Sequence, residues 1–184
     1  MTAEKIMTIT AADYGKMVNA AAAKLTANAE NINKLNVFPV PDGDTGTNMA
    51  MSMASGAQYE RDSQAETVGA LAKATSKGLL MGARGNSGVI LSQIFRGISD
   101  SLADKATLSA RDLADALMMA AQVAYKSVMK PTEGTILTVI REAAAAADEA
   151  ASAGQDLPTM METVAQTAQV ALDKTPDLLP VLKE

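Results

Sequence analysis

The sequence contains no cysteine and no histidine. Without cysteine, the chain has no disulfide framework, no thiolate nucleophile and no cysteine-based zinc site. Without histidine, it has no catalytic triad built on a histidine base and no phosphohistidine relay of its own. Any chemistry within this chain therefore depends on carboxylates, amides, hydroxyls, basic side chains and backbone groups.

The sequence also has few basic residues and no long apolar run. Lys and Arg number 16 against 21 Asp and Glu, which gives a net charge of -5 and a pI near 4.8. This balance argues against a surface for nucleic acid or anionic membranes. No stretch could span a bilayer and no signal peptide begins the chain, so we expect a cytoplasmic protein. A negatively charged ligand would need a metal ion, a helix N-terminus or bases such as Arg84 and Lys130.

Aromatic residues are scarce, with two Phe, three Tyr and no Trp, whereas alanine, leucine and methionine are plentiful. This composition favours closely packed helices, and 184 residues with 48% hydrophobic content suit one all-α domain. Apolar residues recur at helical spacing along most of the chain, and no segment predicts a strand. Thr10 with Asp13, and Ser109 with Asp112, predict two helix starts.

Other helix boundaries follow from local signals alone. A short helix is expected to begin at residues 49–53 and to end near Gly56. Ser87 is expected to be the N-cap of a further helix. The last clear helix is expected from Pro158 to about Asp173.

The motif PDGDTGTN at residues 41–48 places two carboxylates one residue apart. Gly43, between Asp42 and Asp44, permits backbone angles that would turn both side chains towards one cation. The spacing does not fit an EF-hand, because Gly46 stands where that loop needs an oxygen ligand. An ordinary exposed turn, in which polar side chains bond their own backbone, is equally compatible with the spacing.

Two further polar turns precede expected helices. GARGNSG at residues 82–88 carries Arg84 but lacks the Lys-Ser or Lys-Thr of a P-loop, and alone it is more simply a helix end followed by a helix start. KPTEGT occupies residues 130–135. Backbone N–H groups at helix starts attract phosphate. An acidic and a basic turn of this kind in one small domain therefore favour magnesium with phosphate as the ligand pair.

Three segments, LNVFPVPDGDTGTNM, SKGLLMGARGNSGVILSQIFRG and AYKSVMKPTEGTILTV, together resemble the N-terminal kinase domain of bacterial fatty acid kinases. That domain is related to the nucleotide-binding L subunit of dihydroxyacetone kinases. The resemblance implies an all-α barrel of about eight antiparallel helices, with the nucleotide in the loops at one end. It also implies that residues 1–184 are one domain, an N-terminal fragment of a longer protein, whose last helix is truncated and whose turnover alone is weak or absent.

The resemblance also implies the roles of individual residues. Asp42 and Asp44 correspond to aspartates that hold two magnesium ions against the nucleotide phosphates, and Asn36 is the nearest candidate for a third metal ligand. Arg84 is expected to stabilise charge on the transferring phosphoryl group. The residues expected to contact ATP are Thr45, Gly46, Thr47 and Asn48 in the first motif, Gly85, Asn86, Ser87 and Gly88 in the second, and Thr135 and Ile136 near the adenine.

The implied activity is transfer of the ATP γ-phosphoryl group to the carboxylate of a fatty acid. A separate fatty-acid-binding protein presents this acid, and the other expected partners are the C-terminal domains of the full-length chain and a second copy in a homodimer. A carboxylate is already an anionic nucleophile, so the lack of histidine agrees with this activity. Two alternatives stay open: the nucleotide-binding subunit of a dihydroxyacetone (glycerone) kinase, and a non-catalytic nucleotide-sensing module.

Overall fold

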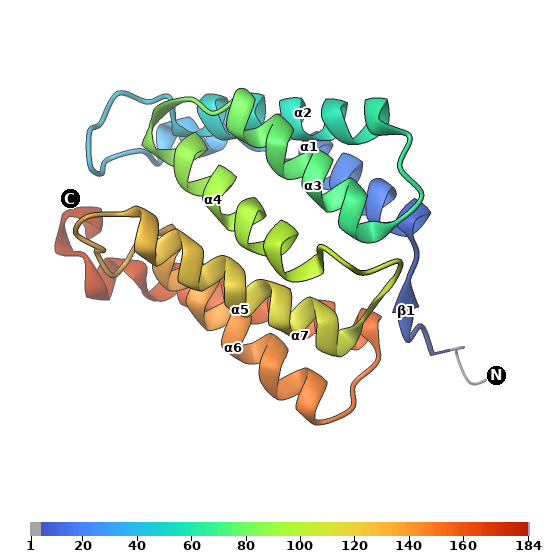
Figure 1. Cartoon of the computed structure of the whole chain (residues 1–184). Helices are drawn as coiled ribbons and strands as arrows, with labels where there is room; N and C mark the ends of the chain where they lie inside the picture. The colour runs from blue at the N-terminus through green and yellow to red at the C-terminus, as the bar shows by residue number, and fades with distance from the viewer. Residues whose placement is uncertain (1–4, 184) are drawn as a thin grey trace.

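The computed structural model describes residues 5–183, which are almost entirely helical (Figure 1). The elements are β1 (Thr8–Ile9), α1 (Ala11–Lys34), α2 (Thr45–Ser63), α3 (Val68–Met81), α4 (Gly85–Leu102), β2 (Leu108–Ser109), α5 (Ala110–Ser127), α6 (Ile136–Ser152), α7 (Leu157–Leu178) and a 3-10 helix (Pro180–Lys183). The all-α class is confirmed. Capping boxes at Thr10 and Ser109 begin α1 and α5, as the sequence predicted.

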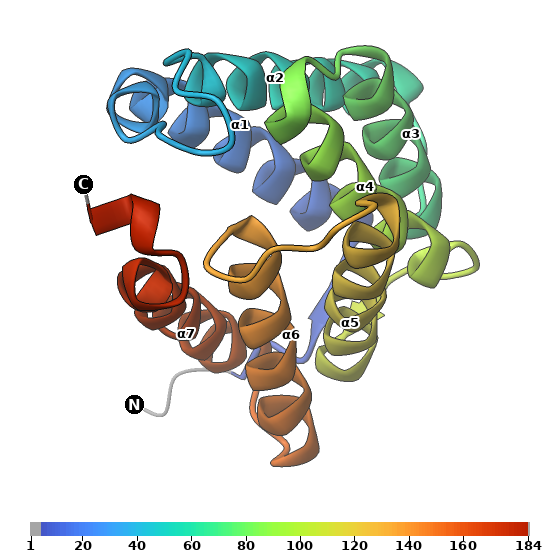
Figure 2. The same cartoon turned by 90° about the vertical axis from the view of Figure 1, so that its left-hand side faces the viewer.

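Successive helices run antiparallel, and each packs against the next one along the chain (Figure 1). α1 and α7, the first and last of the described helices, do not pack along each other (Figure 2). The structure confirms the antiparallel arrangement, while closure into a barrel stays a prediction. Because the helix directions alternate, α2, α4 and α6 all begin at one end of the molecule, at the left of Figure 1. Within residues 5–183, none of the helices combines the length and the apolar content needed to cross a membrane.

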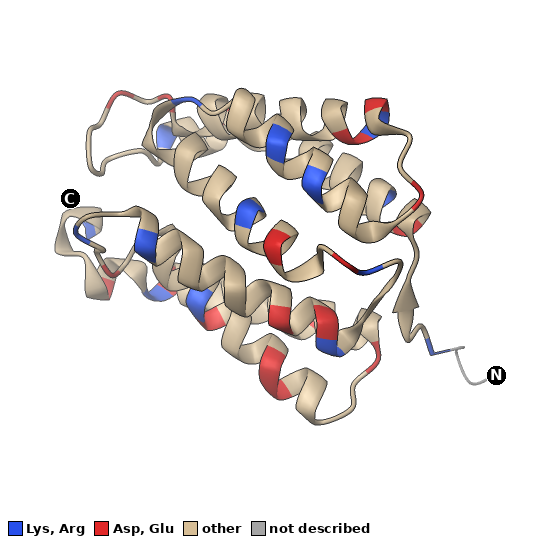
Figure 3. Cartoon of the chain, viewed as in Figure 1, with Lys and Arg blue, Asp and Glu red and all other residues tan. Residues whose placement is uncertain are grey.

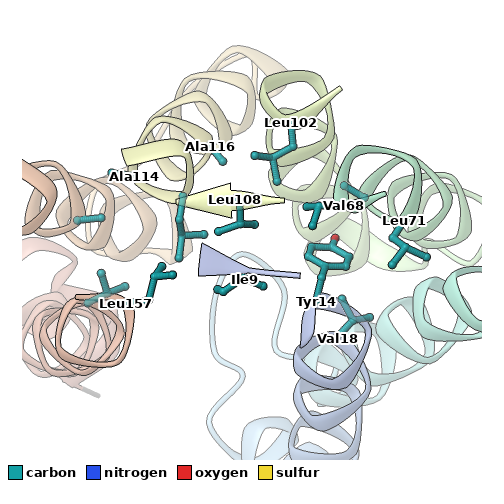
Figure 4. Packing of buried hydrophobic residues seen from close by; sticks show 14 of the residues in the cluster. Ile9, Tyr14, Val18, Val68, Leu71, Leu102, Leu108, Ala114, Ala116 and Leu157 are labelled. Atoms are coloured by element: carbon teal, nitrogen blue, oxygen red, sulfur yellow. The ribbon is translucent and has the colours of Figure 1, made fainter. Parts of the chain in front are cut away.

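The N-terminal segment connects several helices at the opposite end. β1 and β2 form a two-residue antiparallel ladder in which Ile9 pairs with Leu108, although the sequence predicted no strand. A ladder this short has no period to detect. The N–H of Leu157 donates to the carbonyl of Ile6 (2.9 Å), which connects the same segment to the start of α7. Ile9, Leu108 and Leu157 are buried in the main core, to which Tyr14 also belongs (Figure 4).

α2 is longer than local signals predicted. It begins at Thr45 instead of residues 49–53, and it continues past Gly56 to Ser63. Gly56 does not end the helix, because it lies where α3 packs closely against α2. A β-carbon at this position would stand 2.6 Å from a methyl carbon of Leu79. Tertiary packing therefore overrides the weak helix propensity of glycine here.

α7 also extends beyond its expected end near Asp173 and contains Pro176 in its last turn. Proline has no N–H group and cannot bond the carbonyl four residues earlier. The hydroxyl of Thr175 donates to that carbonyl, on Leu172, at 2.7 Å. A side chain thus replaces the missing backbone hydrogen bond, and the helix continues to Leu178.

Candidate functional site

The three polar motifs lie at the same end of the molecule. They form the α1–α2 loop, the α3–α4 turn and the α5–α6 loop, at the left of Figure 1, and Figure 2 views this end directly. These connections lead into α2, α4 and α6. The N-termini of three helices, which carry the positive ends of the helix dipoles, therefore meet at the end that bears the motifs.

The starts of α2 and α4 differ from the other helix starts in their capping. The N-cap side chains of α1, α3, α5, α6 and α7 accept a hydrogen bond from the helix that they begin, whereas those of α2 and α4, Asp44 and Arg84, do not. The N-cap of α4 is Arg84 and Gly85 is its first residue, so the expected N-cap at Ser87 is wrong. The first N–H groups of both helices are therefore not used by the side chains of their own N-cap residues.

The open donors can be assigned to particular residues. In the part of the chain that the structure describes, the N–H groups of two residues of α2 and three of α4 make no protein hydrogen bond. They belong to Thr45, Gly46, Gly85, Asn86 and Ser87. All five are among the residues that the family resemblance predicts to contact ATP. Nothing in the sequence indicated that the N-cap side chains of these two helices would make no cap hydrogen bond.

Asn33, near the end of α1, uses the remaining early donor of α2. Its Oδ1 accepts from the N–H of Thr47 (3.0 Å), and its Nδ2 donates to the Thr47 hydroxyl (2.9 Å). Thr47 therefore gives its backbone donor to the protein. Sequence analysis missed Asn33, because it lies within an ordinary helical pattern and its partner is 14 residues away. An amide side chain in the last turn before a polar motif is the signal that could have identified it.

The first two motifs touch each other. The hydroxyl of Ser87 donates to the carbonyl of Thr45 (3.4 Å). The amide nitrogen of Asn48 lies 2.6 Å from the place that a β-carbon on Gly85 would take. Ser52, one turn further into α2, donates to the carbonyl of Asn48 at 2.7 Å. The structure thus brings residues from both motifs side by side at the starts of α2 and α4.

The charged residues of these motifs are exposed and unpaired. Asp42 and Asp44 flank Gly43, whose φ of 67° is the left-handed conformation that the sequence predicted. Neither carboxylate forms a hydrogen bond or ion pair with another described residue, and Arg84 forms no ion pair within residues 5–183. Acidic and basic segments both occur at this end (Figure 3).

The donor set of this loop fits magnesium. Among residues 5–183, no three His, Cys, Asp or Glu side chains converge as a closed metal cage. Mg²⁺ is usually held by one or two carboxylates, with water and phosphate oxygens in its other positions. The free carboxylates of Asp42 and Asp44 match that requirement.

Asn36, the candidate for a third ligand, shapes the loop in this structure. Its Oδ1 accepts from the N–H of Gly43 (3.1 Å), and its Nδ2 donates to the carbonyl of Val40 (3.0 Å). Both ends of the amide therefore hold the backbone between α1 and Asp42. A role for Asn36 in metal binding stays a prediction.

The third motif lies at the same end but is built differently. Thr135 is the N-cap of α6, where its hydroxyl accepts from the N–H of Leu137 (3.3 Å), and Ile136 is the first residue of the helix. Glu133 accepts hydrogen bonds from Thr138 (2.6 Å) and Tyr125 (2.9 Å). No hydrogen bond joins this loop to the first two motifs within the described residues. The sequence did not single out Glu133, because its partners come from two different helices.

The environment of Glu133 should make the free energy of unfolding depend on pH. Hydrogen bonds from Thr138, then Tyr125 and Arg141, hold the pKa of Glu133 below its ordinary value of 4.5, against the opposing effect of burial. The folded state thus favours the ionised carboxylate of Glu133. The contribution of this carboxylate to folding stability is complete when the pH lies above its ordinary pKa, and it is lost as the pH falls through the lowered pKa of the folded state. We expect Glu133→Gln to reduce the free energy of unfolding at about pH 7 and the difference from wild type to shrink at about pH 3. Urea denaturation of both proteins at both pH values measures the difference in their free energies of unfolding. A difference of equal size at the two pH values would contradict the prediction.

Two surface hollows lie away from the motifs. One, of about 350 Å³, is lined by residues that include Gly15, Glu60 and Leu71, and the other, of about 490 Å³, runs over alanines of α1 and α2. None of the residues assigned to the three motifs lines either hollow. We therefore place the candidate site at the uncapped helix starts, where the free donors and charges lie.

An all-α domain with free donors at two adjacent helix starts and unpaired carboxylates beside them is an anion-binding scaffold suited to phosphate with a metal ion. Residues 39–184 match the model of a known family, the DAK2 domain. The chain belongs to the DAK2 domain family. These are ATP-binding domains related to the L subunit of dihydroxyacetone kinase.

The chain is also similar to longer bacterial proteins. It is 50% identical to Protein YloV of Bacillus subtilis over 179 residues, which are 97% of this chain and 32% of that protein. It is 49% identical to the uncharacterized protein SSP1546 of Staphylococcus saprophyticus over 171 residues, which are 93% of this chain and 31% of the relative. The chain therefore spans about a third of the length of these curated relatives.

Proposed function

We propose that this chain is the ATP- and Mg²⁺-binding phosphoryl-donor domain of a fatty acid kinase. The observation that carries the proposal is the pair of adjacent, uncapped starts of α2 and α4, whose open N–H groups lie beside unpaired Asp42, Asp44 and Arg84. Membership of the DAK2 family supports nucleotide as the ligand. The resemblance of the three motifs to fatty acid kinases supports the acceptor.

In this proposal, Asp42 and Asp44 hold the metal, and Asn36 either joins them or only shapes their loop. Bound Mg²⁺ would neutralise charge on the phosphate oxygens. The free N–H groups of α2 and α4 would donate hydrogen bonds to the phosphate oxygens and fix their position. The capped start of α6, with Thr135 and Ile136, carries no free donor at its N2 position and is assigned to the adenine.

The proposed reaction forms a bond between the fatty acid carboxylate oxygen and the γ-phosphorus, and breaks the bond to ADP. The carboxylate carries its own negative charge, so no base is required, which agrees with a chain that has no histidine. Arg84 would stabilise the charge on the transferring phosphoryl group. A separate fatty-acid-binding protein would present the acid, and the rest of the longer protein would supply any further contacts.

Calorimetric titration of ATP into this chain, with and without Mg²⁺, tests nucleotide binding. We expect binding to depend on Mg²⁺ and to raise the melting temperature, because a ligand that binds only the folded state stabilises it. Failure of wild type to bind ATP at millimolar Mg²⁺ would rule out the proposed function.

Phosphoryl transfer is then measured in the full-length protein with a fatty acid and its carrier. Transfer to dihydroxyacetone with a partner subunit would favour the glycerone kinase alternative, and binding without any transfer would favour a sensing module.

A further inference from the structure

The α5–α6 loop is organised around one carboxylate, that of Glu133. Its Oε1 accepts from the hydroxyl of Tyr125 (2.9 Å) and from Nη1 of Arg141 (2.7 Å), and its Oε2 accepts from the hydroxyl of Thr138 (2.6 Å). The Arg141 guanidinium also lies over the Tyr125 ring, 5.9 Å from its centre. These partners come from α5 and α6, so Glu133 fixes the loop to both helices that it connects.

The same network fixes the backbone just before α6. The buried hydroxyl of Thr138 accepts from the N–H of Gly134 (2.8 Å). Gly134 has a φ of 79°, and a β-carbon there would stand 2.6 Å from the β-carbon of Leu179. The hydroxyl of Thr135 closes the turn by donating to the carbonyl of Thr132 (2.8 Å). The loop is thus held by α5, by α6 and by the end of α7.

This loop differs chemically from the other two motifs. The starts of α2 and α4 place free N–H groups beside the unpaired charges of Asp44 and Arg84, a combination suited to phosphate with a metal ion. The start of α6 is capped by its own Thr135, and Ile136 follows directly. A preformed loop with an apolar residue at its end suits the base, which is the part of a nucleotide with a flat, largely apolar face. A preformed loop also binds more tightly, because its ordering costs nothing at the time of binding.

We infer that Glu133 is a positioning residue for the nucleotide base. Glu133 does not contact the ligand, but it holds residues 132–136 in the conformation that contacts the purine. It thereby sets the preference for ATP over GTP and over inorganic tripolyphosphate. This inference rests on the proposed function. It predicts that loss of the Glu133 carboxylate weakens base recognition and leaves phosphate binding at α2 and α4 intact.

Glu133→Gln and Glu142→Gln form a matched pair for the test. Glutamine at 133 has one oxygen, so either Thr138 or the Tyr125–Arg141 pair loses its acceptor. Glu142 also accepts from Arg141 (3.0 Å), yet no hydrogen bond joins it to the described loop residues. Each variant and wild type is titrated with ATP, GTP and inorganic tripolyphosphate in the presence of Mg²⁺. Melting temperatures are recorded for all three proteins.

For Glu133→Gln we expect the dissociation constant of ATP to rise about tenfold, whereas that of tripolyphosphate stays within about twofold of wild type. The preference for ATP over GTP should fall in parallel. Glu142→Gln should match wild type for every ligand. If Glu133→Gln does not fold, Tyr125→Phe keeps the ring and removes one hydroxyl, which donates to Glu133 (2.9 Å) and accepts from Arg141 (3.0 Å). It should weaken ATP binding in the same direction by about threefold.

Three results would overturn the inference. Unchanged ATP binding in a folded Glu133→Gln protein shows that the carboxylate does not position the base. An equal loss for ATP and tripolyphosphate shows a general structural effect instead. Failure of wild type to bind either ligand removes the proposed function itself, which distinguishes that failure from the first two.

Discussion

Asp42→Asn and Asp44→Asn should each abolish the Mg²⁺ dependence of ATP binding by this chain. Both carboxylates are exposed and free of ion pairs within residues 5–183, so neither contributes an ion pair that the substitution would break. Asparagine keeps the shape of the side chain but loses the charge that a hard divalent cation requires. We expect the dissociation constant of ATP in Mg²⁺ to rise roughly a hundredfold, about 2.8 kcal/mol, because even residues that only orient metal ligands contribute 10- to 100-fold.

The matched control is Asp104→Asn. Asp104 is exposed between α4 and β2, at the end of the molecule away from the motifs, and it forms no ion pair within the described chain. This variant changes the net charge by the same amount but should bind ATP as wild type does. Calorimetric titration of ATP at several Mg²⁺ concentrations distinguishes the loss of a metal ligand in Asp42→Asn and Asp44→Asn from the effect of net charge alone in Asp104→Asn. Normal Mg²⁺ dependence in both Asp42→Asn and Asp44→Asn would disprove the metal assignment.

Arg84→Ala should leave nucleotide affinity near that of wild type and sharply reduce phosphoryl transfer by the full-length protein. Arg84 is exposed at the N-cap of α4, and its side chain makes no cap hydrogen bond, so its loss should not disturb the helix start. A guanidinium that meets charge only in the transition state lowers the barrier without strengthening ground-state binding. We expect the turnover number to fall by roughly a hundredfold or more at a nearly constant KM for ATP.

Arg96→Ala provides the comparison for this prediction. Arg96 is exposed on the same helix, where its Nε lies 3.9 Å from the carboxylate of Asp100, a weak surface pair. Transfer should be normal in that variant. Equal turnover of Arg84→Ala and wild type would remove Arg84 from the reaction. A rise in KM with unchanged turnover would instead assign Arg84 to ground-state binding of the nucleotide.

The fold class and several helix starts could be predicted because their causes are local. Thr10 with Asp13 forms a capping box that needs only four consecutive residues, and the one at Ser109 is the same. The length of α2 could not be predicted in this way. Gly56 continues the helix only because Leu79 of α3 packs there, and this contact joins residues far apart in sequence.

The candidate site shows the same division. The sequence identified Asp42, Asp44 and Arg84 because unusual residue types were crowded into short motifs. It did not identify Asn33, whose partner lies 14 residues away, or Glu133, whose partners come from two helices. The missing caps were equally hidden: Asp44 could have capped α2 but does not, and α4 begins behind Arg84, which has no acceptor, instead of at Ser87.

Those two uncapped helix starts have a consequence for the energetics of folding. A side-chain cap contributes about 1 kcal/mol to a helix. Asn33 replaces that cap at α2, so it is at α4 that the free domain forgoes a small part of the stability that its other helices obtain. A phosphate group held by the same N–H groups would restore it. The first turns of α2 and α4 should then be the places where unliganded amides exchange most readily with solvent, and where a ligand protects them most. The fraction of the protein that has phosphate bound and the protection of these amides from exchange would then rise together, because both report the same binding equilibrium.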